Sequence, residues 1–276
     1  DTNGITVGAL SANGGTLKDG ASNNAALTLN SVGSTTAVLV DGVAPSVTSI
    51  NRVTSASTNA TSVDYTVTFA ENVTGVDASD FALTATGTAA GTIASVTQVN
   101  GSTYTVTVNS ISGDGTMRLD LNASGTGIAD APGNAITAGY TSGQTYSFDH
   151  TAPAVTSVGV PANATYIAGD NLDFTVNFGE AVTVNTGGGT PRIAITLDTG
   201  GTVYADYVSG SGTSALTFRY TVASGNLDTN GIAVGALGGN GGTLKDAAGN
   251  DATLTLNSVG STAAVLVDAV VPTADI

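Results

Sequence analysis

The chain has 276 residues, enough for about two domains, and 41% of them are hydrophobic, so it can form buried cores. Its 6 Lys and Arg residues against 21 Asp and Glu residues give a net charge of -15, which argues against nucleic-acid partners and favours divalent cations. The absence of Cys excludes disulfides and thiolate metal sites, and no apolar run approaches the roughly 20 residues of a membrane span, so we expect no membrane insertion.

The first 45 residues return nearly unchanged as residues 228–272. The two copies differ at ten of 45 positions (6, 11, 12, 20, 22, 24, 26, 36, 42 and 44). Their separation is too long for a helical or propeller repeat and fits a pair of sandwich domains. Residues 1–45 are therefore predicted to be the C-terminal part of an immunoglobulin-like repeat. Because half a sandwich exposes an apolar face, we expect either preceding residues of a longer chain or strands of a neighbouring molecule to complete it.

Three linkers of the form apolar-Asp-x-x-x-Pro end at Pro45, Pro153 and Pro272. Each proline fixes its own φ and holds the preceding residue extended, so the linkers are predicted to be short and stiff. They divide the chain into an immunoglobulin-like repeat of one type at 46–153 and a second type at 154–272. Residues 1–45 belong to that second type, and residues 273–276 would begin the next repeat.

Alternation of apolar and polar residues predicts strands along both complete repeats. Residues 63–69 and 172–178 each send four apolar side chains to one face and are equivalent strands. Further strands are predicted at 104–108, 193–197 and 216–222, separated by turns rich in Gly, Asn, Asp and Ser. The sequence therefore predicts an all-β fold of tandem immunoglobulin-like β-sandwiches in a linear rod.

Both complete repeats carry two acidic motifs in addition to the linker aspartate. The first is Phe-x-Glu-x-Val, where the glutamate directly follows an apolar strand. The second is the turn Asp-x-x-Gly-Asn, which the partial repeat also contains with Ser22 in place of the glycine. Calcium prefers six to eight oxygen ligands from carboxylates, amides, backbone carbonyls and water. If glutamate, turn and linker meet at one pole of a sandwich, a Ca2+ ion there would fix the angle between repeats.

The predicted calcium ligands come from these three motifs. They are the strand-end glutamates Glu71 and Glu180, the turn residues Asp19, Asn23, Asp130, Asn134, Asp246 and Asn250, and the linker aspartates Asp41, Asp149 and Asp268. The same turn is also stable by itself through side-chain hydrogen bonds to its backbone and a residue at positive φ. A purely structural turn therefore remains an alternative.

Taken together, the three motifs resemble the bacterial immunoglobulin-like tandem repeats of large surface adhesins, biofilm-associated proteins and SwmB-type repeats, over nearly the whole chain. The resemblance implies an extender or stalk segment of a secreted protein, often stiffened by calcium at its module junctions. Such a stalk holds a distal binding domain away from the bacterial cell surface, for cell adhesion or biofilm formation. Its partners would be the neighbouring repeats of the same long chain.

Two other functions share these sequence features. The chain could be a subunit of a self-assembling extracellular filament, sheath or surface layer, in which copies associate by strand pairing. A carbohydrate-binding module is a lesser alternative, because Trp is absent and exposed rings would have to come from Tyr140, Tyr166, Tyr204 and Tyr207. An enzyme is not expected, since the single His, His150, is predicted to lie in an exposed linker and no Cys nucleophile exists.

Overall fold

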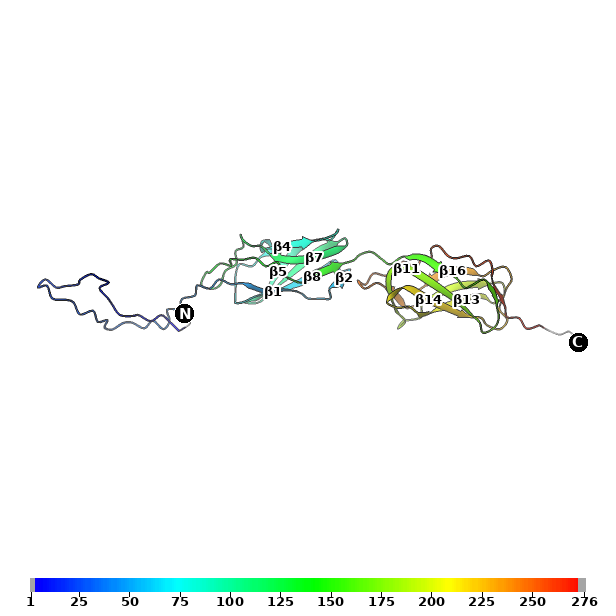
Figure 1. The fold of residues 1–276 in the computed structure, drawn as a ribbon, viewed down its shortest axis with the longest axis horizontal. Coiled ribbons are helices and arrows are strands. Elements are labelled where there is room, and N and C mark those ends of the chain that lie inside the picture. Colours follow the sequence, from blue (N-terminus) through cyan, green and yellow to red (C-terminus); the bar gives the residue numbers. More distant parts are fainter. Residues whose placement is uncertain (1–2, 273–276) are drawn as a thin grey trace.

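A computed structural model describes residues 3–272, and the predicted start of a further repeat at 273–276 lies outside this range. Within it, the secondary structure consists of strands and one 3-10 turn, η1 (Ala78–Asp80), so the fold is all-β. Two strand-rich bodies follow one another along the longest axis of the molecule (Figure 1). We call residues 46–153 the first module and residues 154–272 the second module. None of the described helical segments is long and apolar enough to cross a membrane.

The first module contains two four-stranded sheets. One has the order β1 (Val47–Arg52), β3 (Val63–Phe69), β6 (Thr103–Ser112) and β5 (Ala90–Asn100). The other has the order β2 (Ser57–Thr58), β8 (Thr145–Phe148), β7 (Gly115–Leu121) and β4 (Phe81–Ala85). Neighbouring strands are antiparallel except β2 and β8, which are parallel.

The two sheets of the first module share one core, which makes the module a β-sandwich. Strand β3 has the bounds predicted for residues 63–69, and its apolar residues are all buried. The ring of Tyr65 on β3 meets the ring of Tyr146 on the opposite sheet edge-on, with centroids 5.2 Å apart. The buried hydroxyl of Tyr65 donates to the carbonyl of Met117, also on the opposite sheet, at 2.8 Å. A buried tyrosine thus keeps its polar tip satisfied while its ring fills the core.

The second module has a larger and a smaller sheet. The larger one follows the order β16 (Ala233–Gly238), β12 (Arg192–Leu197), β13 (Gly201–Ser209), β14 (Thr213–Thr221), β11 (Asn171–Asn185) and β17 (Thr243–Lys245), and β9 (Val155–Gly159) also pairs with β11. The smaller one comprises β10 (Ala164–Tyr166), β18 (Val265–Asp268) and β15 (Leu227–Asp228), with β10 parallel to β18.

Strand β11 is longer than the predicted strand at 172–178. Its pairing with β14 shifts register between Asn177 and Val182, and the strand then continues into a second pairing with β17. Such an irregularity bends a strand and increases its twist. Glu180 lies inside this irregular stretch, so the predicted position after the apolar face is correct while the strand itself does not end there.

Residues 3–45 form an open loop at one end of the molecule (Figure 1). Their sequence is nearly the same as that of residues 230–272, yet their apolar side chains are exposed. Leu17 is 54% exposed and its counterpart Leu244 only 4%, and Val38 is 46% exposed while Val265 is fully buried. The difference arises because strands of residues 155–221 cover Leu244 and Val265. That residues 1–45 belong to a complete repeat stays a prediction.

Candidate metal centres

Acidic side chains converge at the start of each module. One group consists of Asp41, Glu71 and Asp130, and the other of Asp149, Glu180 and Asp246. In each group, carboxylate oxygens of the three residues lie within 4.8 Å of one another. We call these the first and the second acidic cluster. Each takes one carboxylate from the linker, one from the glutamate of the Phe-x-Glu-x-Val motif and one from the Asp-x-x-Gly-Asn turn. The structure therefore brings together the three motifs whose meeting the sequence analysis gave as the condition for a Ca2+ ion that fixes the angle between repeats.

The turns hold their aspartates in place through backbone donors. In the second module, Oδ1 of Asp246 accepts the N–H groups of Gly249 at 2.7 Å and Asn250 at 2.8 Å. Gly249 has a φ of 102°, in a region that side chains other than glycine rarely adopt. The turn of the first module has the same bonds from Gly133 and Asn134 to Asp130. These bonds bury the aspartate and orient its remaining lone pairs.

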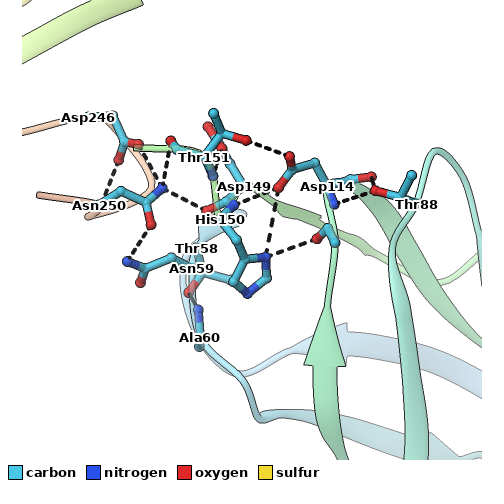
Figure 2. A network of polar contacts seen from close by, with 11 residues as sticks. Thr58, Asn59, Ala60, Thr88, Asp114, Asp149, His150, Thr151, Asp246 and Asn250 are labelled. Atoms are coloured by element: carbon cyan, nitrogen blue, oxygen red, sulfur yellow. Dashed lines mark hydrogen bonds and ion pairs between the residues drawn. The ribbon is translucent and has the colours of Figure 1, made fainter. Parts of the chain in front are cut away.

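The asparagine of each turn braces the cluster through its amide nitrogen. Nδ2 of Asn250 donates to the carboxylate of Asp246 at 2.7 Å and to the backbone carbonyl of Asp149 at 2.8 Å (Figure 2). In the first module, Nδ2 of Asn134 donates to Asp130 at 2.7 Å and to the carbonyl of Asp41 at 3.1 Å. The predicted ligands Asn134 and Asn250 thus fasten the linker to the turn with the nitrogen end of the amide.

The linker aspartates share one local conformation. In each linker, Oδ1 of the aspartate accepts the backbone N–H group two residues further along the chain. The acceptor–donor pairs are Asp41 with Val43 at 3.0 Å, Asp149 with Thr151 at 2.9 Å, and Asp268 with Val270 at 3.3 Å. An aspartate that forms such a turn keeps its second carboxylate oxygen free of this bond. All three linkers are therefore shaped in the same way.

The linker between the modules is also tied to the module that precedes it. Asp114, in the turn between β6 and β7, accepts the N–H of His150 at 2.6 Å and the hydroxyl of Thr151 at 2.7 Å (Figure 2). These two bonds, the backbone one first, hold the pKa of Asp114 below its ordinary value. His150 lies 2.9 Å from the carbonyl of Gly113 through Nδ1 and stacks on Phe148. The expectation of an exposed linker histidine was wrong, because His150 is half-buried against its own module.

The environment of the second cluster favours the protonated form of Glu180. Burial, and then the negative charges of Asp149 and Asp246, raise the pKa of Glu180 above its ordinary value of 4.5. In the first cluster, burial raises the pKa of Asp130, but hydrogen bonds from Asn134 and Gly133 outweigh it and leave the pKa lowered.

The cluster carboxylates form no ion pair with a basic side chain in the part of the chain that the structure describes. Nζ of Lys245 does, however, donate to the carbonyl of Gly249 in the turn of the second cluster at 3.2 Å. Three carboxylates that converge without a positive partner form an all-oxygen donor set, which suits a hard divalent cation such as Ca2+.

Besides Asn134 and Asn250, which brace the clusters, three predicted site residues lie outside the two clusters. Asp19 and Asn23 form the expected turn, with Oδ1 of Asp19 accepting the N–H of Asn23 at 2.9 Å, and Ser22 there has a φ of 70°. Asp268 forms its linker turn. In the described part of the chain, Asp19 and Asp268 join no group of three acidic side chains of this kind.

The sequence analysis missed Asn59, which crosses the boundary between the modules. Its backbone N–H donates to the carbonyl of Ala248 at 3.1 Å, and its side-chain Nδ2 donates to Oδ1 of Asn250 at 3.0 Å (Figure 2). The amide of Asn250 is thereby bonded at both ends. No repeat motif marks Asn59, because its partner lies 191 residues further along the chain.

The tyrosines considered for carbohydrate binding do not form an open platform. Tyr204 is 40% exposed, but the guanidinium of Arg192 lies 3.8 Å from the centroid of its ring. Tyr207 packs edge-on against Phe218. Tyr140 and Tyr166 are half-buried against the cores of their modules.

No protein-family profile and no curated protein sequence matches the chain. A solved structure of FdeC, described as a broadly conserved Escherichia coli adhesin that elicits protection against urinary tract infections, matches with 13% sequence identity and a TM-score of 0.35. The match covers 78% of this chain and 66% of that one, so it spans just under two thirds of the structure that it matches. A TM-score of this size does not establish a common fold.

Proposed function

We propose that the chain is an extender segment of a secreted bacterial surface adhesin, built from tandem immunoglobulin-like modules in a linear rod that calcium stiffens at each junction. The observation that carries this proposal is the composition of the two acidic clusters. Each combines one linker carboxylate with two carboxylates of the module that follows. A cation held by all three would fix the linker to that module. Outside the cell, adhesin modules of this kind would serve cell adhesion or biofilm formation.

The residues that would hold the ion in the second cluster are Asp149, Glu180 and Asp246, with backbone carbonyls or water completing the coordination. When bound, calcium supplies positive charge that offsets the repulsion between the three carboxylates. Hydrogen bonds within the protein then hold the linker to both neighbouring modules. Asp114 fastens Thr151 to the first module, and Asn250 fastens Asp149 to the second. A junction held from both sides transmits a fixed angle between modules.

The proposal is tested by thermal unfolding of the full chain with calcium and with chelator. At a free concentration about 100 times Kd, one bound ion adds roughly 2.7 kcal/mol, which raises the Tm of a module of this size by about 10 °C. Asp149→Asn and Glu180→Gln are expected to abolish the shift of the second module. Asp206→Asn, which removes the same charge from an exposed position on β13, is the matched control and should retain it. Equal unfolding temperatures of the parent chain in calcium and in chelator would refute calcium stiffening.

A self-assembling filament or surface layer is the second candidate, and the exposed apolar side chains of residues 3–45 favour it. Leu10, Leu17 and Val38 are about half exposed, whereas their counterparts in the second module are buried. Apolar surface of this kind is covered in many assemblies by strands of another copy. Sedimentation velocity of the full chain over a wide concentration range distinguishes the candidates, because an open polymer grows with concentration while an extender segment stays monomeric.

A further inference from the structure

At the end of each module from which its linker leaves, one structurally equivalent position is occupied by a different residue in the two modules. In the first module, β2 runs parallel to the last strand, and Thr58 pairs with Phe148, the residue before the linker Asp149. In the second module, β10 runs parallel to the last strand in the same way, and Tyr166 pairs with Val267, the residue before Asp268. The next residue along the chain is Asn59 in the first module and Ile167 in the second. Both therefore stand at the linker end of their modules.

The chemistry at this position changes from polar to apolar. Asn59 donates two hydrogen bonds to the turn of the second module, of which Figure 2 shows the one from its side chain to Asn250. Ile167 has no polar side-chain atom, and its backbone N–H already donates to the carboxylate of Asp170 at 2.9 Å. Its side chain is 60% exposed. The end of the second module cannot repeat the hydrogen bonds that join the first module to the second.

The linker that follows the second module is also more apolar than the linker that follows the first. Thr151 and Ala152, in the linker after the first module, correspond to Val270 and Val271 after the second. Val270 is 49% exposed and Val271 is 74% exposed. Ile167, Val270 and Val271 thus place three exposed apolar side chains at one end of the second module. We call them the apolar end.

The turn that receives Asn59 also differs between the modules. In the second module, Ala248 and Gly249 are half-buried beneath Asn59. In the first module, Pro132 stands in the place of Ala248, and both Pro132 and Gly133 are exposed. Both residues have a backbone carbonyl, but Pro132 adds an exposed apolar ring at the position where the second module has the small side chain of Ala248.

The order of segments within the chain identifies the partner. Residues 228–272, which contain β16, β17, β18 and the linker of the second module, nearly repeat residues 1–45, and residues 1–45 lead directly into the first module. The module type that ends in residues 228–272 thus precedes a module with Pro132 in its turn, and in the 1–45 copy Val43 stands at the position of Val270 and Ala44 at that of Val271. Asn59 and Ala248, in contrast, meet at the junction from the first module to the second.

We propose that the apolar end is a docking surface for the Pro132 turn of a module of the 46–153 type that follows Pro272 in the same chain. The junctions then alternate between a hydrogen-bonded and an apolar contact, and the contact chemistry determines which module type follows which. The inference rests on the tandem arrangement in the proposed function, but the apolar contact needs no calcium. If the two module types followed one another in a different order, Oδ1 of Asn250 would lose the hydrogen bond that Asn59 donates. Ile167 would then also have no proline ring to pack against.

The test uses the full chain extended by a second copy of residues 46–153 joined after Pro272, as the original copy is joined after Pro45. Because the chain contains no Cys, spin labels can be introduced at Cys substitutions of the exposed residues Thr202 and, in the added copy, Ser95. Distance distributions between the labels are measured with calcium and with chelator. Ile167→Asn is compared with Thr165→Asn, which introduces the same residue at an exposed position on β10.

A narrow distribution is expected in chelator for the parent chain and for Thr165→Asn. Ile167→Asn is expected to lower the ratio of docked to undocked junctions about tenfold and to lose the narrow component, because covering the exposed part of an isoleucine is worth about one power of ten in an equilibrium constant. Equal Tm values of the second module in the unextended parent and Ile167→Asn chains would show that the change is not one of folding.

The outcomes separate this inference from the calcium proposal. Distributions that depend on calcium but not on residue 167 would overturn docking by the apolar end and leave calcium stiffening intact. Distributions that depend on residue 167 but not on calcium would support the docking surface and contradict calcium stiffening. A broad distribution for the parent chain under both conditions would overturn the docking surface.

Discussion

The duplicated sequence allows one substitution to be compared in two environments within a single molecule. Leu17 and Leu244 occupy the same position of the repeat, between the same neighbours Thr and Lys. Leu244 lies on β17 in the core of the second module and is 4% exposed, whereas Leu17 is 54% exposed. We predict that Leu244→Ala destabilises the second module strongly and that Leu17→Ala has almost no effect on unfolding.

The magnitudes follow from burial. Replacing a buried leucine by alanine costs about 2 to 5 kcal/mol, from lost transfer free energy and from the cavity left behind. A cost of about 3 kcal/mol lowers the Tm of a domain of about 120 residues by about 12 °C. An exposed substitution changes stability by about 0.5 kcal/mol or less. Differential scanning calorimetry of the full-length variants resolves this, with the transition of the first module as an internal reference. Comparable losses from Leu17→Ala and Leu244→Ala would refute the contrast and show that residues 3–45 have a core of their own in solution.

Four further outcomes are expected. Gly249→Ala should destabilise the second module by about 1 to 2 kcal/mol in urea unfolding, because the added Cβ has space but a φ of 102° strains any residue except glycine. Without calcium, the second module should lose stability as the pH rises from 4.5 through the raised pKa of Glu180, because its folded state favours the protonated acid, and Glu180→Gln should remove this slope. Calcium affinity should change in the opposite direction and fall as the pH falls through that pKa, which calorimetric titration measures. Tyr65→Phe should cost about 1 to 3 kcal/mol in urea unfolding of the first module, because the buried carbonyl of Met117 loses its donor.

Much of the fold and the acidic clusters could be predicted because both depend on local patterns. The alternation at residues 63–69 predicts β3 with its observed bounds, since a half-buried strand needs little more than a period of two. The spacing of Asp246, Gly249 and Asn250 predicts their turn, because the hydrogen bonds join residues at most four apart. Repetition of these motifs then indicated that the glutamate, the turn and the linker belong to one unit.

The contacts across the module boundary could not be predicted in this way. Asn59 and Asn250 meet only because two loops, 191 residues apart, face one another after both sandwiches have formed. His150 is half-buried because the turn at Gly113 and Asp114 folds over the linker, and no periodicity marks that approach. The role of Asn250 also depended on orientation, since an amide can approach a cation with its oxygen or brace a carboxylate with its nitrogen.

The junction combines attraction and repulsion at the same linker residue. The carbonyl of Asp149 is held by Asn250, while its carboxylate lies within 4.8 Å of two further carboxylates. With a cation present, both groups of Asp149 would draw the linker onto the second module. Without one, the carboxylates repel each other and oppose the bond that Asn250 makes. The geometry that would make the junction stiff in calcium would therefore weaken it in a calcium-poor compartment, so a single residue pair, Asp149 and Asn250, would couple the ion to the angle between modules.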